Sequence, residues 1–432
     1  MNIHQTPSTM IIPLPANEAP AEERIIRLLT DQFPMFGKES SKVWEESAPA
    51  NVPWVLPARI PGLPHIVFIW PEPLEDLPEC AWWNSQDSDG ELKALSDNCK
   101  HSLVVETTFS SEDSLKQWKI QLQTALTLSA DAPFIYDDSS MKVITRIEAE
   151  AIAELPIEPA IQDVYSFHTD YEEKQPDSLW AHTHGLSRLG AFEMDALNIQ
   201  QHNREVCARL FALIVEKQLE KQQFDHTQII ISDNLEVQLI KLEDALSSDK
   251  EPDVFGRLSD RDDKHIENRA ILLEQNNNVA LSLLKNPGSD LSINNLLEQI
   301  KQEQSYLQSP KEAERTKNLA QYRWPIFCSL FKIRDQYNWE FLIQAQYSTT
   351  EKDLTERLWF KVSTFGDKAI KAILVNEANY MHEMKIGDDF EILQNNVCDW
   401  AISTEDGNYY PSNIISLASK SGIEVKSPDP VH

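Results

Sequence analysis

Apolar residues recur at helical spacing in several well-separated stretches of the chain. Such a stripe predicts an amphipathic helix, because one face of the helix meets the core. The predicted helices cover residues 17–33, 111–128, 201–219, 293–307 and 310–323. Pro325 cannot donate to a helical ladder, so we expect the chain to kink or to restart a helix at Trp324.

Other stretches are rich in β-branched and aromatic residues, or alternate apolar with polar residues, and these patterns predict strands. Before residue 288 they alternate with helices, whereas after it they follow the helices as an antiparallel set. The predicted strands are 65–70, 102–109, 163–170, 179–187, 227–232, 235–242 and 270–274, then 339–348, 358–365, 369–376 and 390–393.

These patterns predict an α+β protein with two domains. A large N-terminal α+β unit would cover residues 1–287, and a smaller domain of helices packed on an antiparallel sheet would cover residues 288–432. The boundary is placed at Asn286-Pro287-Gly288, a strong loop signal. We expect a fragment starting at Ser289 to fold separately.

Residues 242–268 carry nine acidic side chains against four basic ones, which predicts a solvated loop or linker. We expect limited proteolysis to cut first between Leu242 and Gly288. The whole chain has a formal net charge of −30. That charge argues against nucleic acid or an anionic membrane as the main partner, and it permits a protein partner, including a basic one.

The first residues lack a basic segment followed by an apolar stretch, and nowhere do about 20 apolar residues run together. We therefore expect a cytoplasmic protein. Its five cysteines are odd in number and widely spaced, without a Cys-x-x-Cys pair. This spacing argues against a disulfide framework and against a four-thiolate zinc site.

His182-Thr183-His184 is the nearest approach to a chemical motif. Residues i and i+2 of a strand share a face about 6.6 Å apart, so we expect both imidazoles on one face, where they could bind one cation. Zinc takes such nitrogens at about 2.0–2.1 Å. His168 on the preceding strand, or Glu193 beyond a glycine turn, would supply a third ligand.

Chance also explains this pair, because 11 histidines in 432 residues give about 0.3 such pairs. A structural or hydrogen-bonded histidine pair is therefore the favoured interpretation, and a metal site is the alternative. An ion pair between Arg188 and Glu193 is the expected use of those two side chains. Familiar signatures of hydrolases, phosphate-binding loops, dinucleotide sites and zinc proteases are absent from the sequence.

The last third of the chain is dense in aromatic side chains. Alternating strands favour a core over a binding platform for such residues, because they bury large areas. They are Trp324, Phe327, Phe331, Trp339, Phe341, Tyr347, Trp359, Phe360, Phe365 and Trp400.

Spaced motifs in this part resemble a known family. The chain contains Ala320-Gln321-x-x-Trp324-Pro325-x-Phe327, Glu340-Phe341-Leu342-Ile343, Arg357-Leu358-Trp359-Phe360-x-Val362, Leu374-Val375-Asn376-Glu377, Lys385-x-Gly387-Asp388-x-Phe390 and Val397-x-Asp399-Trp400. This order resembles the YegJ-like family, a small bacterial domain of unknown function. The segment from Leu179 to Glu193, with its His-Thr-His-Gly-Leu run, resembles a second uncharacterised bacterial domain family that can precede the YegJ-like one. Neither resemblance implies an activity, and the export signal of simple YegJ-like proteins is not seen.

Val397 and Trp400 differ in parity, so they cannot share one face of an uninterrupted strand. We expect a bend or bulge near Cys398 that turns Trp400 inward, while Asp399 accepts hydrogen bonds from backbone amides. The rival interpretation makes Trp400 an exposed residue that stacks on a ligand.

The sequence as a whole favours a non-enzymatic, protein-binding or regulatory module without a cofactor. The alternative is a metal-dependent hydrolase centred on His182 and His184, with zinc as the ion. The candidate metal ligands are His168, His182, His184 and Glu193, and the candidate binding residues are Arg188, Asn376, Glu377, Asp399 and Trp400.

Overall fold

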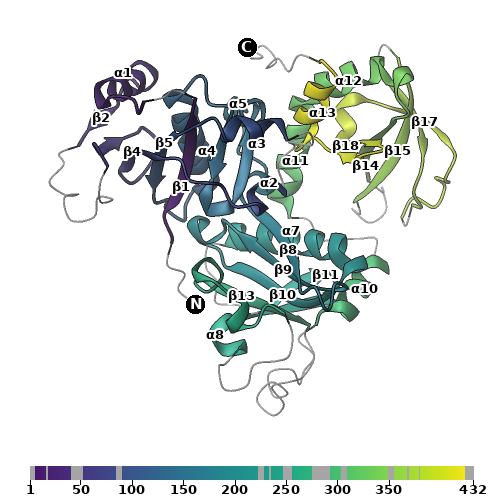
Figure 1. The fold of residues 1–432 in the computed structure, drawn as a ribbon. Coiled ribbons are helices and arrows are strands. Elements are labelled where there is room, and N and C mark those ends of the chain that lie inside the picture. Colours follow the sequence, from purple (N-terminus) through teal and green to yellow (C-terminus); the bar gives the residue numbers. More distant parts are fainter. Residues whose placement is uncertain are drawn as a thin grey trace. The chain divides into compact units, whose positions relative to one another are not determined.

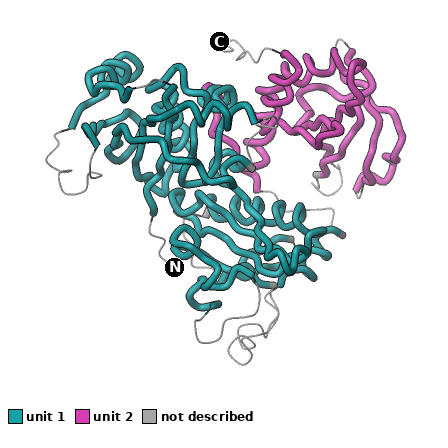
Figure 2. Tube along the Cα trace, viewed as in Figure 1, with its two compact units in different colours: residues 1–153, 161–308 teal, residues 154–160, 309–432 magenta. Residues whose placement is uncertain are grey.

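The computed structural model describes residues 5–15, 18–39, 52–83, 90–221, 228–232, 235–246, 255–274, 292–302, 309–348, 355–366, 369–378 and 380–423. Two compact units make up the chain (Figure 2). Unit 1 comprises residues 1–153 and 161–308, and unit 2 comprises residues 154–160 and 309–432. Helices and largely antiparallel sheets occur in both units, which confirms the α+β class.

The first sheet of unit 1 has the strand order β2-β3-β4-β5-β1-β6-β7, and its pairings are antiparallel (Figure 1). Its strands are β1 (Ser8–Leu14), β2 (Gly37–Lys38), β3 (Leu56–Arg59), β4 (Val67–Pro73), β5 (His101–Thr107), β6 (Phe134–Asp137) and β7 (Lys142–Thr145). Strand β1 was not expected, because Pro13 interrupts its apolar run. In the structure Pro13 is the second-last residue of the strand, where the loss of its backbone N–H affects only the end of the strand pairing.

Helices pack on both faces of this sheet because side chains alternate along its strands. Met10 and Ile12 of β1 join the larger core with Trp118, and Ile11 points into a smaller cluster with Ala81. The larger core is covered by α1 (Glu22–Gln32), α4 (Ser114–Leu128) and α5 (Arg146–Ala153), and the smaller cluster contains residues of α2 (Cys80–Trp83) and α3 (Glu91–Ser96).

The second sheet of unit 1 has the order β11-β12-β13-β10-β9-β8. The pairing of β10 with β13 is parallel, and the other pairings are antiparallel. Its strands are β8 (Ser166–Tyr171), β9 (Ser178–His184), β10 (Glu193–Gln200), β11 (Gln228–Ser232), β12 (Leu235–Lys241) and β13 (Arg269–Glu274). The expected pairing of β8 with β9 is confirmed.

One face of this second sheet packs against α6 (Ile161–Val164), α7 (Arg204–Lys221) and α10 (Asn294–Gln302). Ala181 of β9 points into that core, whereas its neighbour Trp180 packs on the opposite face with Leu242 and Phe255. The opposite face therefore meets the segment that was expected to be a solvated loop. That expectation holds only in part for its described residues. They include exposed turns around residues 262–267, but also α8 (Leu242–Ala245) and two short 3-10 helices, η5 (Leu258–Asp260) and η6 (Asp263–His265), with Leu242 and Arg261 buried.

Unit 2 contains an antiparallel sheet with the order β17-β16-β15-β14-β18-β19. Its strands are β14 (Glu340–Ser348), β15 (Thr355–Phe365), β16 (Ile370–Leu374), β17 (Asp389–Ile392), β18 (Val397–Thr404) and β19 (Gly407–Tyr409), and its helices are α11 (Pro310–Tyr322), α12 (Trp324–Lys332) and α13 (Ile414–Lys420). The expected helix restart at Trp324 is confirmed, with Pro325 in the first turn of α12.

The expected bulge near Cys398 is also confirmed. Gln344 of β14 faces Asp399 while the next residue, Ala345, faces Val397, so Cys398 is the extra residue. The bulge turns Trp400 inward, where its side chain is 0% exposed and its Nε1 donates to the carbonyl of Ala320 at 2.9 Å. The rival interpretation of an exposed Trp400 is wrong.

The predicted boundary at Asn286-Pro287-Gly288 lies outside the described residues, and separate folding of residues 289–432 stays a prediction. Helix α10, which follows that boundary, places Leu296 and Leu297 in the core of unit 1. A fragment starting at Ser309 therefore gives the cleaner test of separate folding. No helix in the described part of the chain combines the length and the apolar character needed to cross a membrane.

Candidate metal centre

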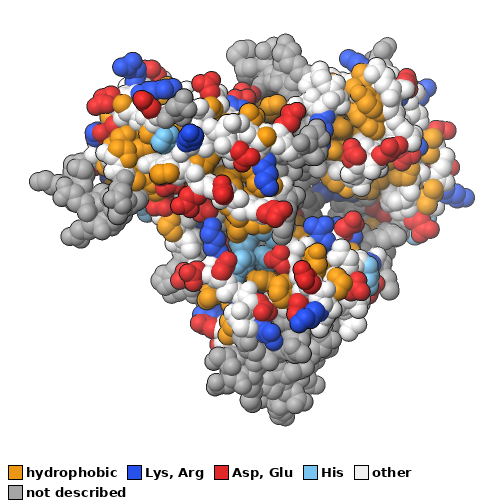
Figure 3. Space-filling model, viewed as in Figure 1, with side chains coloured by type: hydrophobic (Ala, Val, Ile, Leu, Met, Phe, Trp, Pro, Cys, Tyr) orange, Lys and Arg blue, Asp and Glu red, His pale blue; other side chains and the backbone are white. Residues whose placement is uncertain are grey.

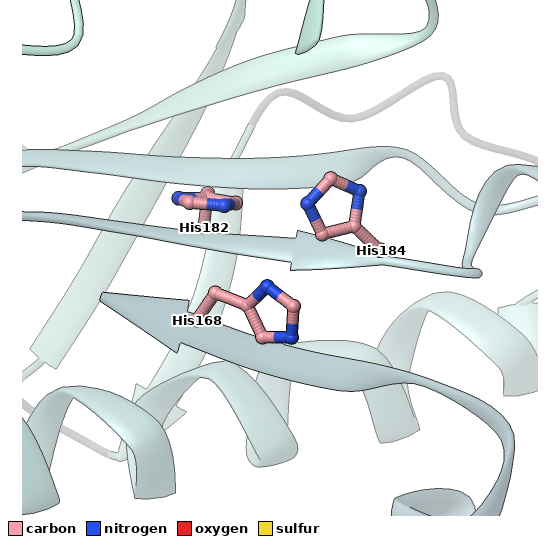
Figure 4. Close-up of side chains that lie close together, drawn as sticks. All are labelled: His168, His182 and His184. Carbon is pink, nitrogen blue, oxygen red and sulfur yellow. The ribbon is translucent and has the colours of Figure 1, made fainter. Parts of the chain in front are cut away.

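Three histidines from two paired strands come together on one face of the second sheet of unit 1. His168 of β8 lies directly opposite His182 of β9, and His184 follows two residues later. One ligand nitrogen from each ring lies within 4.8 Å of the other two (Figure 4). The expected common face of His182 and His184 is therefore confirmed, and the strand register adds His168 to it.

These imidazoles are buried, with exposed fractions of 3% for His168, 1% for His182 and 4% for His184. Within the described residues, Nδ1 of His182 and Nε2 of His184 have no hydrogen-bond partner. A buried polar atom without a partner costs about 1–3 kcal/mol. Each ring makes a hydrogen bond through its other nitrogen, His182 to His265 at 3.3 Å and His184 to Arg269 at 3.5 Å. Among the described residues each ring thus keeps one buried nitrogen without a partner, and the choice between a structural pair and a metal site stays a prediction.

Burial also sets the charge of the three rings. It lowers the pKa of His168 to about 4, with His265 and Arg269 adding to the effect. Burial likewise holds the pKa of both His182 and His184 well below 6.5, reinforced by neighbouring imidazoles and by Arg269. All three rings are neutral at pH 7, and neutral imidazole is the form that binds metal.

A buried charge network surrounds the histidines. Asp195 of β10 lies 3.2 Å from guanidinium nitrogens of both Arg261 and Arg269, and it accepts a hydrogen bond from Nε1 of Trp180 at 2.7 Å. Nη2 of Arg269 donates to the carbonyl of Thr183 at 2.9 Å. The network ties β9, β10 and β13 to the 255–268 segment, so it fixes the strand that carries two of the rings.

His265 is a member of the cluster that the sequence analysis missed. Its Nε2 lies 3.3 Å from Nε2 of His182, and its Nδ1 lies 2.5 Å from Oδ1 of Asp262. Its ring centroid is 4.8 Å from that of His184. Because residues 242–268 were expected to form a solvated loop, His265 was not considered as a candidate site residue. The available signal was the Asp262-x-x-His265 spacing, which permits a local carboxylate–imidazole pair.

Glu193 lies beside this cluster but orders the chain rather than joining the three-histidine group. Its Oε1 accepts from the backbone amides of Gly185, Leu186 and Ser187 at 2.7–3.0 Å, and its Oε2 accepts from Oγ1 of Thr183 at 2.8 Å. These bonds fix the turn that follows His184.

The expected ion pair between Arg188 and Glu193 is wrong. After Gly185, whose φ of 103° reverses the chain, Arg188 points toward the first sheet. There its two Nη atoms each donate to one oxygen of Asp137 at 2.6 Å. Both side chains are fully buried.

The remaining candidate residues lie in unit 2, where backbone groups hold two of them. Asn376 accepts from the amide of Trp359 at 2.7 Å and donates to the carbonyl of Glu377, whose own side chain is exposed. Asp399 accepts from the amide of Trp400 at 2.8 Å, as expected. A ligand-binding role for these residues stays a prediction.

Asp399 should make the stability of the protein depend on pH. Burial raises its pKa from 3.8 to about 7, so between these values the folded protein holds a proton that the unfolded chain releases. Stability from this group is therefore lost as the pH rises through about 7. We expect Asp399→Asn, which keeps an oxygen for the Trp400 amide, to be more stable relative to wild type at pH 8 than at pH 4.5. Urea unfolding at both values measures this difference, and a difference that is the same at both would contradict it.

Two family models match parts of the chain. Residues 163–273, which contain all four histidines of the cluster, match the model described as protein of unknown function (DUF4026) C-terminal. Residues 320–419, within unit 2, match the model described as uncharacterized protein conserved in bacteria (DUF2314). No curated protein and no solved structure matches the chain. The chain is thus similar over these two segments to two uncharacterised bacterial families.

Proposed function

We propose that unit 1 binds a divalent transition-metal ion, with zinc as the best fit, through His168, His182 and His184. The observation that carries this proposal is the convergence of three buried, neutral imidazoles with ligand nitrogens within 4.8 Å of one another. Nitrogens bound to one zinc ion at 2.0–2.1 Å lie about 3.3–3.4 Å apart in a tetrahedron. Separations of up to 4.8 Å would have to shorten to that spacing when the ion binds, by rotation of the rings.

The charge around the histidines supports this proposal. Asp195 offsets one of the two guanidinium charges of Arg261 and Arg269, so these three side chains keep a net charge of +1 that two further carboxylates must balance. Oδ2 of Asp170 lies 3.8 Å from Nε2 of His182, and Asp262 contacts His265. Histidine atoms are visible at the surface in the middle of the face in Figure 3, among acidic and basic side chains.

The reaction class that this arrangement supports is hydrolysis. Three protein ligands leave a coordination position for water, and zinc lowers the pKa of a bound water to about 7. Asp170 and Asp262 would then be the nearby groups able to accept a hydrogen bond from that water. A metal-dependent hydrolase is accordingly the activity we propose for unit 1.

Metal content tests the proposal. The chain, purified without a histidine tag, is equilibrated with zinc, dialysed against metal-free buffer and analysed by elemental mass spectrometry. We expect about one zinc ion per chain. His182→Ala and His184→Ala should each weaken zinc binding by more than the ~10–100-fold that loss of an outer partner costs.

His202→Ala is the matched control, because His202 lies in the same unit, is exposed and pairs only with Glu298 among the described residues. It should retain the wild-type zinc content. Wild-type protein that holds no zinc, or a His182→Ala variant that holds as much as wild type, would contradict the proposal. Hydrolysis of p-nitrophenyl esters and phosphodiesters by the zinc-loaded chain then tests the reaction class.

A protein-binding or regulatory role is a second candidate, and for unit 2 one observation favours it. Its described surface exposes large apolar side chains, with exposed fractions of 39–57%, at Tyr337, Val375, Tyr380, Ile386, Leu393 and Tyr410. Unit 2 has 20 acidic and 14 basic residues, and this modest negative charge permits a basic partner. A photo-crosslinking residue at position 386 should capture a protein in cells that the same residue at position 340 does not, and equal capture would contradict the role.

The YegJ-like assignment of this unit, the family assignment of the His-Thr-His-Gly-Leu segment and the cytoplasmic location stay predictions.

A further inference from the structure

The geometry points to His265 as the fourth ligand of the proposed metal site, an inference that rests on the proposed function. Nε2 of His265 lies 3.3 Å from Nε2 of His182. Two nitrogens bound at 2.0–2.1 Å to one tetrahedral zinc ion are separated by about 3.3–3.4 Å. The observed separation, which in this structure is a hydrogen bond between the two rings, matches the edge of such a tetrahedron.

Asp262 prepares His265 for this role. A carboxylate 2.5 Å from Nδ1 of His265 holds the ring proton on that nitrogen, so Nε2 keeps its lone pair toward His182. A metal-binding histidine commonly donates its second ring nitrogen to a carboxylate, which fixes the ring and raises its basicity. The Asp262–His265 pair has this arrangement already in place.

The chain segment that carries His265 is anchored to the sheet. Arg261 donates from Nη1 to Asp195 at 3.2 Å and to the carbonyl of His265 at 3.0 Å. Its guanidinium lies 4.7 Å from the ring centroid of Trp180. These contacts, rather than chance proximity of a surface loop, set the position of the His265 ring.

A fourth nitrogen changes what the metal site can do. Four protein ligands give a closed site, whereas a catalytic site keeps a position for water. His265 would therefore exclude water from the ion in the resting protein, and hydrolysis would require this ring to leave. His265 is then the residue that decides between a closed and an open metal site.

The visible absorption of bound Co²⁺ tests this inference. Co²⁺ can replace zinc in its sites, and its visible spectrum depends on the number and kind of ligands that bind it. In the wild-type chain we expect a spectrum that is constant from pH 6.5 to 8.5 and unaffected by azide. In His265→Ala a water takes the fourth position, so the spectrum should change with an apparent pKa near 7 and respond to azide. Asp262→Asn should weaken Co²⁺ binding by about 10–100-fold, and His202→Ala should behave as wild type.

The outcomes separate the two proposals. A wild-type chain that binds no Co²⁺ overturns the proposed metal site itself. A wild-type chain that binds Co²⁺ but already shows the pH and azide response of His265→Ala leaves the metal site standing and overturns the role of His265. Equal Co²⁺ affinity in wild type and Asp262→Asn would also count against the orienting role of Asp262.

Discussion

Asp137→Ala is expected to lower the free energy of unfolding by about 3–5 kcal/mol, because it leaves the guanidinium of Arg188 buried without its partner. Both side chains are fully buried, and two 2.6 Å hydrogen bonds join them. Asp137 also accepts from Nε1 of Trp118 at 3.1 Å. Arg188 also donates to Oγ of Ser8 and to the carbonyl of Val164.

This pair joins the two sheets of unit 1. Asp137 ends β6 of the first sheet, and Arg188 follows β9 of the second. Urea unfolding of the full chain measures the loss, with Glu150→Ala as the control. Glu150 pairs with Arg146 on the surface, so its removal should cost no more than about 1 kcal/mol. If Asp137→Ala were no more destabilising than this control, the pair would not be holding the sheets together.

The double variant Asp137→Leu with Arg188→Met separates the buried charge from the loss of packing. Replacing both members of a buried pair with apolar residues is often nearly neutral, whereas removing one member leaves an uncompensated charge. We therefore expect the double variant to regain most of the stability lost by Asp137→Ala. A double variant that is less stable than either single variant would contradict this explanation.

Trp400→Ala is expected to cost about 3–5 kcal/mol, the range for truncating a large core aromatic residue. The indole is fully buried, lies 4.9 Å from the ring centroid of Phe327, and donates to the carbonyl of Ala320 on α11. It therefore joins the sheet of unit 2 to both α11 and α12. Removing it also leaves that carbonyl without its indole donor.

Hydrogen exchange in the full chain measures this effect within unit 2. In Trp400→Ala, the free energy of opening derived from amide exchange should fall by about 3–5 kcal/mol in peptides from β14. The exchange of peptides from β9 in unit 1 should stay unchanged. Trp339→Ala is the control, since Trp339 is only partly buried and stacks on the exposed Tyr337. If exchange in β14 were unchanged by Trp400→Ala, the core assignment of this residue would be wrong.

Local patterns were enough to predict part of the candidate site. The i, i+2 spacing of His182 and His184 fixes their common face, and the alternation of Asp163 to Asp170 made His168 a reasonable third member. Parity likewise predicted the bulge at Cys398, because Val397 and Trp400 cannot both point inward from a regular strand.

The parts of the candidate site that were not predicted depend on contacts between residues far apart in the sequence, which local residue spacing does not reveal. Strand β10 is buried on both faces and carries the charged Asp195, so it shows no alternation of apolar and polar residues. Its parallel pairing with β13 is what places Arg269 beside the histidines. His265 lies in an acidic segment whose composition is typical of a solvated loop. Its position near His182 follows from the anchoring of Arg261, a contact distant in sequence from β9.

Anomalous X-ray diffraction at the zinc absorption edge, on crystals grown with one equivalent of zinc, tests the metal site most directly. We expect the strongest anomalous peak among the rings of His168, His182 and His184, about 2.0–2.1 Å from a nitrogen of each ring. His265 should supply the fourth nitrogen at the same distance. Peaks confined to surface residues such as His202, with none among the three buried rings, would contradict the assignment of a metal centre to unit 1.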